Sequence, residues 1–583
     1  MSKLNVDQRT IFDLFSDRKS DFLIPDYQRP YEWEDKECQT LWDDIQKFAF
    51  PDDDSSKFDS DNDEYYLGPI VTFKNKEGKM EIIDGQQRLT TLMLLLRAFH
   101  EKFGKMKDPK ALKTRENLSK CIWKIDEYQQ PIMGCLKINS EVATDDDKEE
   151  FLYILEHGET SDTMKSNYAK NYRFFQQKIK EFQDVYSDPL SLFPTRLLNN
   201  CILLPIDADN QNTALRIFST LNDRGMPLSD ADIFKAQFYK YYSQSNRKDF
   251  FIKHWRDLEV CCKAIFHPIT GTPMDDLFTR YMYYKRASNK LTSSTTEALR
   301  SFYEKDNYSL LNNEQTLTDL ETLAAFWNDV NNQDTTRFST QVLRRLFVLN
   351  YAPNGMWAYI TSVYYLHNKD REGNLDDTRF YNFLNKITGF IWAYSITNPG
   401  VNALRTPIYR EMVNIVENKE VTFADWVFEP VKLKSMLNNY VFSNNRAITK
   451  SMLTWWAFNT NDQPLLDIDT TFEIEHIFAR KRQESQKELQ NPKSMDLLGN
   501  KSLLERKINI RASDYRWSDK VKYYKGELLD RKQNKKEGTK IVELLKLSET
   551  NTNFIEADIE KRNNAIFDGF IDFLKNNNLI QQS

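Results

Sequence analysis

The chain has 583 residues and a mass of 69.1 kDa, and 80 Lys and Arg against 86 Asp and Glu give it a formal charge of −6. Hydrophobic residues make up 40% and aromatic residues 13%, which excludes a disordered or collagen-like chain because enough apolar surface can be buried to offset chain entropy. No aliphatic run approaches the roughly 18 residues that span a bilayer, and the polar N-terminus has no signal-peptide core, so we expect a soluble, cytoplasmic protein. The cysteines form no C-x-x-C pair, so neither a disulfide framework nor a cysteine-based zinc site is expected.

The N-terminal part alternates strand-like and helical segments, which is typical of an α+β fold. Strands are predicted at residues 22–25, 66–73 and 80–84, an amphipathic helix at 37–48, and a helix with one apolar face at 89–96.

The rest of the chain is mostly helical in pattern. Residues 109–193 show charged helical periods, a strand is predicted at 201–206, and helices follow to about residue 440. A short strand is predicted at 472–477, before further helices. We therefore predict an α+β, predominantly helical protein with three parts: residues 1–245 with a helical insertion at about 105–195, a helical coupling region at 246–440, and a C-terminal domain at 441–583.

Charge is distributed unevenly along the chain. Residues 471–540 hold 18 Lys and Arg against 11 Asp and Glu, a net charge of +7, which leaves −13 for the remainder. A basic segment on an acidic protein favours a localised site for a polyanion, because phosphate contacts gain from counterion release. Solvated helix faces are the alternative interpretation of the same charges.

A polar box, Asp84-Gly85-Gln86-Gln87-Arg88, lies between a predicted strand and a predicted helix. Glycine lets the backbone approach a ligand, the first N–H groups of a helix lack intrahelical partners, and Arg88 adds a planar cation, so the box suits a phosphate. A helix N-terminus capped by Asp84 is the structural alternative.

Two other motifs accompany this box. Residues 24–33 contain the pair Gln28-Arg29 among three aromatic residues, and residues 221–232 form a polar turn. Together the motifs resemble the ParB-like N-terminal domain of GmrSD-type, modification-dependent (type IV) restriction systems. The resemblance implies a domain that binds and hydrolyses a nucleoside triphosphate, with Asp84, Gly85, Gln86, Gln87 and Arg88 matching the family's signature box and Gln28 and Arg29 its upstream pair. No P-loop motif is present, so any nucleotide site is of another kind.

A second constellation lies in the basic segment. His476 follows Glu475 on a strand-like run, Asn500 lies in Leu-Gly-Asn-x-x-Leu-Leu, and Asn509 comes downstream. A lone histidine on a strand is more often structural, but this order resembles the HNH nuclease domain of the same GmrSD-type family, a ββα-metal fold whose hairpin carries the first two elements and whose helix carries the third.

This second resemblance implies single-metal hydrolysis of a phosphodiester. His476 would take the proton from the attacking water, a task that suits an imidazole. Glu475 and Asn509 would hold Mg²⁺ or Mn²⁺ through oxygen atoms, and Asn500 would orient His476 or brace the hairpin. The third position is Asn instead of the commoner His, and Asp514 and Asp519 are the alternative ligands.

Basic residues near these positions are candidates for contacts with DNA phosphates, and they are Lys501, Lys507, Arg511, Arg516 and Lys520. Trp517, which lies among them, is expected in the core.

These patterns together favour a nucleotide-regulated, modification-dependent DNA endonuclease that defends a prokaryotic cell against phage. Its expected partners are double-stranded, modified phage DNA, a nucleoside triphosphate, Mg²⁺ or Mn²⁺, and a second copy of the chain if it forms a homo-oligomer. Two alternatives remain open: a ParB-like, nucleotide-dependent DNA-binding switch without cleavage, and an RNase or nicking toxin.

Overall fold

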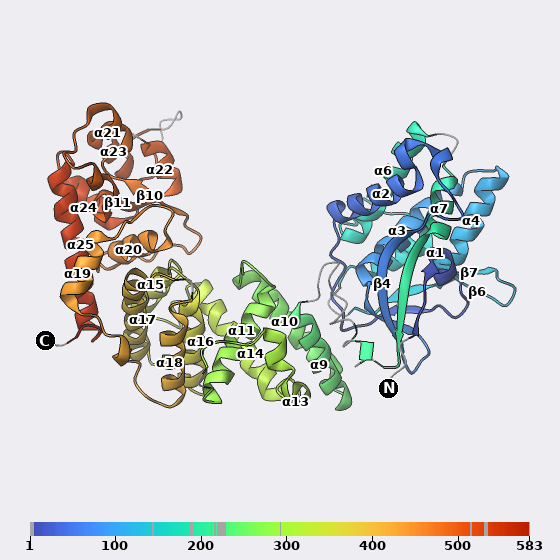
Figure 1. Ribbon diagram of the computed structural model, residues 1–583, viewed down its shortest axis with the longest axis horizontal. Helices are drawn as coiled ribbons and strands as arrows, with labels where there is room; N and C mark the ends of the chain where they lie inside the picture. The colour runs from blue at the N-terminus through green and yellow to red at the C-terminus, as the bar shows by residue number, and fades with distance from the viewer. Residues whose placement is uncertain are drawn as a thin grey trace. The chain divides into compact units, whose positions relative to one another are not determined.

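The structure is a computed structural model that describes residues 5–142, 145–186, 190–210, 213–214, 217, 229–291, 293–400, 402–513, 516–529 and 535–581 (Figure 1). Contacts within the chain divide it into two compact units, Met1–Arg256 and Asp257–Ser583.

In the described part of the first unit, seven strands form one mixed sheet in the order β1-β9-β4-β5-β3-β8, with β2 also paired to β9. Strand β4 runs antiparallel to β5 and parallel to β9, and β3 runs parallel to both β5 and β8. The strands are β1 (Asn5–Val6), β2 (Arg9–Thr10), β3 (Phe22–Ile24), β4 (Tyr65–Lys74), β5 (Met80–Asp84), β8 (Ile138–Ser140) and β9 (Cys201–Ala208). The strands predicted at 22–25, 66–73, 80–84 and 201–206 are confirmed.

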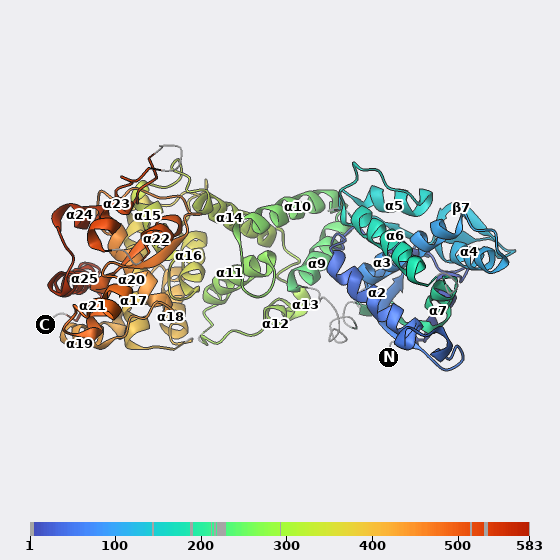
Figure 2. The same cartoon turned by 90° about the horizontal axis from the view of Figure 1, so that it is seen from above.

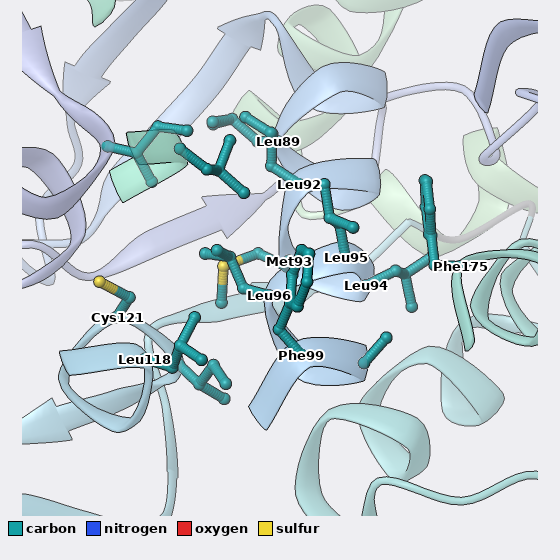
Figure 3. Packing of buried hydrophobic residues seen from close by; sticks show 14 of the residues in the cluster. Leu89, Leu92, Met93, Leu94, Leu95, Leu96, Phe99, Leu118, Cys121 and Phe175 are labelled. Atoms are coloured by element: carbon teal, nitrogen blue, oxygen red, sulfur yellow. The ribbon is translucent and has the colours of Figure 1, made fainter. Parts of the chain in front are cut away.

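Helix α3 (Gln86–Phe103) is the central helix of this unit. Its leucines at 89, 92 and 94–96 are fully buried and pack with Leu118, Cys121 and Phe175 of neighbouring helices (Figure 3). The neighbours are α1 (Ile11–Phe15), α2 (Asp35–Ala49), α4 (Pro109–Ile122), α5 (Lys148–His157), α6 (Asn167–Val185) and α7 (Leu192–Asn200). The helices predicted at 37–48 and 89–96 are therefore confirmed.

The side chains of successive residues of β5 point to opposite faces of the sheet, as in any strand. Ile82 belongs to the large core around α3, whereas Ile83 joins a smaller core with Tyr27, Val71 and Ala236. Ala236 lies on α9 (Asp230–Gln244), which α10 (Lys248–Ile265) follows.

The predicted helical insertion at about 105–195 is only partly helical. Helices α4, α5 and α6 are present, but β6 (Trp123–Ile125) and β7 (Pro131–Leu136) form a hairpin, and β8 joins the main sheet. In β8, Ile138 pairs with Phe22 of β3. A strand this short owes its conformation to pairing with a distant segment, so local periodicity does not indicate it.

The middle of the chain, in its described residues from 257 to 440, consists of helices and their connections, as predicted, with one isolated β-bridge between Phe428 and Ile580 (Figure 2). Helix α11 packs on α16 and α18, and α15 packs on α17. The helices are α11 (Pro273–Ser288), α12 (Leu299–Tyr303), α13 (Lys305–Tyr308), α14 (Glu314–Asn331), α15 (Thr340–Leu349), α16 (Met356–Asn368), α17 (Asp377–Thr397), α18 (Arg405–Val416) and α19 (Pro430–Asn439). Within the described residues, every helix is too short or too polar to cross a membrane.

The C-terminal part adds an antiparallel pair of strands, β10 (Phe472–His476) and β11 (Lys501–Glu505), to a set of helices (Figure 1). The helices are α20 (Ala447–Phe458), α21 (Arg480–Gln486), α22 (Arg506–Ala512), α23 (Trp517–Tyr524), α24 (Val542–Thr550) and α25 (Glu556–Asn576).

Candidate functional site

The predicted phosphate box joins strand β5 directly to helix α3. Gly85 makes this connection in the left-handed conformation, with φ 91°, which few residues with a side chain adopt. Burial raises the pKa of Asp84, while the Gly85 N–H and the charges of Arg88 and Arg29 act in the opposite direction. Asp84 is thus half-buried beside a helix N-terminus and feels the charges of two arginines, of which Arg88 donates to the Pro69 carbonyl (2.9 Å) and Arg29 lies 3.5 Å from Glu32. A cationic helix N-terminus of this kind can accept a phosphate.

Two glutamines of the N-terminal motifs donate to backbone carbonyls. Gln28 Nε2 donates to the carbonyls of Ile82 (3.3 Å) and Ile83 (3.2 Å), and Gln86 Nε2 donates to that of Arg29 (2.6 Å). Both side chains are buried, and Gln86 Oε1 has no hydrogen-bond partner among the described residues. Gln28 therefore braces the end of β5, and Gln86 ties the start of α3 to the Arg29 carbonyl.

Gln87 fixes the segment that follows Arg29. Its Nε2 donates to the Pro30 carbonyl (2.9 Å), and its Oε1 accepts from the Glu32 N–H (2.8 Å). Asn171 of α6 adds a hydrogen bond from its Nδ2 to the Tyr31 hydroxyl (2.9 Å). Sequence analysis missed Asn171, because nothing local connects it to a residue 140 positions earlier. Gln87 thus links the box at residues 84–88 to the motif at residues 24–33.

Most of the predicted polar turn at 221–232 lies outside the described residues. Its last part, from Ser229, caps helix α9: Ser229 Oγ accepts from the Asp232 N–H (3.1 Å), and Asp232 Oδ2 accepts from the Ser229 N–H (3.0 Å). The contribution of this turn to nucleotide binding stays a prediction.

In the C-terminal part, a hairpin and a helix bring three predicted residues to one pocket. Glu475 pairs with Ser502 and His476 with Lys501 across β10 and β11, and α22, which carries Asn509, begins directly after β11. Glu475, His476 and Asn509 all line a pocket of about 270 Å³. Strands β10 and β11 and helix α22 follow one another along the chain, and the HNH layout that the resemblance implies stays a prediction.

Glu475 is buried and held by two donors from α23. Its Oε1 accepts from Lys520 Nζ at 2.7 Å and from the Tyr524 hydroxyl at 2.5 Å. Lys520 Nζ also donates to the His476 carbonyl at 2.5 Å. Burial, together with the Glu475 charge, raises the pKa of Tyr524 well above its ordinary value, so its hydroxyl stays a donor.

His476 presents a neutral imidazole. Burial lowers its pKa to about 3, and the charges of Arg480, Lys501 and Lys520 act in the same direction. Its Nε2 is buried without a hydrogen-bond partner among the described residues. The half-buried ring lines the pocket, where a neutral imidazole can accept a proton.

Asn500 braces the chain just after His476. It is fully buried; its Oδ1 accepts from the Phe478 N–H (2.7 Å), and its Nδ2 donates to the carbonyls of Phe478 (3.2 Å) and Met495 (3.1 Å). Of the two predicted roles, orienting His476 or bracing the hairpin, this geometry supports the second.

The turn that carries Asn500 is itself fixed by α25. Arg562 NH1 donates to the carbonyls of Leu498 (3.0 Å), Gly499 (3.0 Å) and Lys501 (2.7 Å), and its Nε donates to Glu543 (2.7 Å). Sequence analysis missed Arg562, which lies 62 positions beyond the asparagine that it supports.

Asn509 contacts a second carboxylate of β10. Its Nδ2 donates to Glu473 Oε2 at 2.8 Å, which directs the carbonyl oxygen, Oδ1, away from that bond. Glu473 also lies 3.3 Å from Arg506 Nε. Glu473 was not among the predicted site residues, although strand periodicity places it on the same face as Glu475. Of the alternative ligands, Asp514 lies outside the described residues and Asp519 pairs with Lys522.

The predicted DNA-binding residues divide into exposed and buried side chains. Lys507 and Arg516 are exposed, and Arg511 is half-buried and donates to the Glu537 carbonyl (3.0 Å). Lys501 and Lys520 are 0% and 1% exposed, and both ammonium groups bind inside the protein. As placed, these two lysines cannot reach a phosphate, so the expectation that they contact DNA is not supported.

Additional residues around the pocket were not predicted. Arg480 lines it with a side chain that is 56% exposed, and Ile510, 65% exposed, lies beside Asn509. Trp517 is buried, as expected, and its Nε1 donates to the Asn551 carbonyl (2.9 Å).

The pocket offers few but suitable groups for a divalent cation. Glu475 keeps Oε2 and Asn509 keeps Oδ1, two hard oxygen donors. No group of three or more His, Cys, Asp and Glu side chains that could hold a metal ion occurs among the described residues. Mg²⁺ retains several waters and needs only one or two protein oxygens, so the pocket fits a hydrated cation better than a closed cage.

The pocket thus combines a buried carboxylate, a neutral imidazole, an amide and an exposed cation. These are groups that the active site of an enzyme acting on a polyanion needs. The family described as GmrSD restriction endonuclease, N-terminal domain, matches residues 11–239, and that described as GmrSD restriction endonucleases, C-terminal domain, matches residues 429–568. The chain belongs to the GmrSD type IV restriction endonuclease family, as its motifs predicted. This family consists of nucleases that act on DNA in defence against phage. No curated protein matches the chain.

Proposed function

We propose that the chain is a nucleotide-regulated, modification-dependent DNA endonuclease that works in the cytoplasm, with an HNH-type active site on β10, β11 and α22. The convergence of Glu475, His476 and Asn509 on one pocket supports this proposal most directly. Arg480, which lines the pocket and is exposed, supports DNA as the polymer because it can contact a phosphate there, and Lys507 and Arg516 add exposed cations in the same part of the chain.

His476 is the general base of the proposed reaction. Its imidazole is neutral at pH 7. The half-buried ring lines the pocket, where a neutral imidazole can accept the proton of an attacking water. Glu475 Oε2 and Asn509 Oδ1 would hold Mg²⁺ or Mn²⁺, and a bound cation would supply the neutralisation of charge that phosphodiester hydrolysis needs. Asn500 keeps the chain after His476 in place and is a positioning residue.

The N-terminal unit is proposed to be a ParB-like domain that binds and hydrolyses a nucleoside triphosphate. Arg29, Arg88 and the first N–H groups of α3 would bind its phosphates, and Gln86 and Gly85 belong to the same box. Asp84 lies between these groups, whereas Gln28 and Gln87 hold the two motifs together.

Nucleotide binding is proposed to gate cleavage. A ligand can shift a population only through a difference in affinity between two conformations, and a shift from 1:99 to 99:1 requires roughly 5.5 kcal/mol. Contacts from Arg29 and Arg88 to a triphosphate can supply part of this difference, because charge-assisted hydrogen bonds are the stronger ones.

A plasmid assay tests the proposal. The protein and its Arg88→Ala variant are incubated with modified and unmodified plasmid, with Mg²⁺ or Mn²⁺, and with each triphosphate in turn; a structured RNA serves as a parallel substrate. We expect the protein to cut both strands of modified DNA in a manner that depends on one triphosphate. In Arg88→Ala, cleavage should no longer respond to that triphosphate.

The other outcomes would contradict the gate or the proposed function. Cleavage that is identical with and without every nucleotide refutes the gate. Nucleotide-dependent DNA retention without scission would indicate a DNA-binding switch, and preferential cleavage of RNA, or nicks alone, would indicate a toxin.

A further inference from the structure

Helix α23 carries two side chains that bind the same carboxylate oxygen. Lys520 and Tyr524 are four positions apart, so they project from one face of the helix. Their Nζ and hydroxyl groups lie 2.7 Å and 2.5 Å from Oε1 of Glu475. Lys520 Nζ also lies 2.5 Å from the His476 carbonyl oxygen, so it links the side chain of one site residue to the backbone of the next.

All three side chains of this cluster are removed from solvent. Glu475, Lys520 and Tyr524 are 4%, 1% and 0% exposed. Lys520 is therefore not a DNA ligand, and its charge is instead matched by the Glu475 carboxylate. Because both donors act on Oε1, the carboxylate cannot rotate without breaking two hydrogen bonds, and its Oε2 keeps one direction.

The pocket shows why that direction matters. Glu475, His476, Asn509 and Lys520 all line it. Outer partners of a metal-binding carboxylate set its orientation, and their loss typically reduces metal affinity or activity 10- to 100-fold.

We propose that Lys520 and Tyr524 are positioning residues of the nuclease site: they fix Glu475 for the cation and, through the His476 carbonyl, the end of β10 that carries the general base. This inference rests on the proposed function of the pocket. Neither residue contacts DNA or the cation, so both act on the rate and on cation affinity, and not on DNA binding.

The sharpest test is Tyr524→Phe in the full-length chain, because it removes one hydroxyl and leaves the Lys520–Glu475 ion pair. Tyr303→Phe is the matched control: Tyr303 is equally buried, and its hydroxyl donates to the Phe278 carbonyl (2.9 Å), far along the sequence from the pocket residues. Three properties are measured for both variants: Mn²⁺ affinity without DNA by calorimetry, kcat and KM for plasmid cleavage, and the thermal unfolding midpoint.

For Tyr524→Phe we expect about 10-fold weaker Mn²⁺ binding, about 10-fold lower kcat and a KM within about twofold of the original. Tyr303→Phe should change the unfolding midpoint alone. Lys520→Met should lower kcat further, with exposed Lys522→Met as its control.

The inference is overturned if Tyr524→Phe binds Mn²⁺ and cleaves DNA as Tyr303→Phe does, or if Tyr524→Phe loses only stability. In either case, cleavage by the unchanged protein leaves the proposed function intact. If the unchanged protein neither binds Mn²⁺ nor cleaves DNA, the proposed function and this inference fail together.

Discussion

Substitution of Gly499 by alanine should disturb the nuclease pocket through the turn that carries Asn500. Gly499 lies in the turn Leu498–Asn500, packed against α25, and a Cβ there would meet the Ile559 carbonyl oxygen at 2.0 Å and the Asn563 nitrogen at 2.7 Å. Both are backbone atoms of a helix, so the turn or the whole helix must shift. Overpacking of this kind costs about 3 kcal/mol, the upper end of the usual range.

Urea unfolding followed by tryptophan fluorescence measures this effect. Gly355→Ala is the control, because a Cβ at Gly355 would have open space around it. Gly499→Ala should unfold at a lower urea concentration and cleave DNA more slowly, since Asn500 moves with the turn. Equal unfolding midpoints for the two variants would refute the inferred close packing of this turn on α25.

Two further predictions concern the N-terminal unit. Gln87→Ala removes the hydrogen bonds that a buried side chain makes to the part-buried Pro30 carbonyl and Glu32 N–H, and it should cost about 2 kcal/mol of stability in thermal unfolding, whereas Gln177→Ala, at an exposed position, should cost little. Burial and Arg97 lower the pKa of His100 from 6.5 to about 3, so the unfolded state binds more protons in this range and stability should fall as the pH drops from 6.5. Denaturant unfolding at pH 7 and pH 5 should show that His100→Gln loses less stability between these pH values than the unchanged protein does. An equal loss of stability in the two proteins would contradict the assignment of this effect to His100.

Local patterns were sufficient to predict the elements that carry the two sites. The alternation in residues 80–84 and the helical spacing after Leu89 indicated β5 and α3, and both are present. The strand with Glu475 and His476 was also predicted, because apolar and polar residues alternate along it. These features depend on neighbours in the sequence, so the sequence alone reveals them.

The contacts that organise the pocket depend on distant segments and left no local signal. Period two places Glu473 and Glu475 on one face, but it does not indicate that Lys520 and Tyr524 bind the second of them. Lys501 looked like a surface cation, yet it pairs with His476 across the hairpin and is buried. Burial is a property of the folded chain, so a basic segment in the sequence overstates the basic surface.

The most direct measurement compares the unchanged protein with His476→Ala under single-turnover conditions, with cleavage and binding of the same DNA fragment followed in parallel. His157→Ala, at an exposed histidine of the N-terminal unit, is the control. We expect His476→Ala to bind DNA within about twofold of the original and to cleave it at least about 100-fold more slowly, since a general base contributes on this scale. Cleavage by His476→Ala at the rate of the control would contradict the assignment of this pocket as the nuclease site.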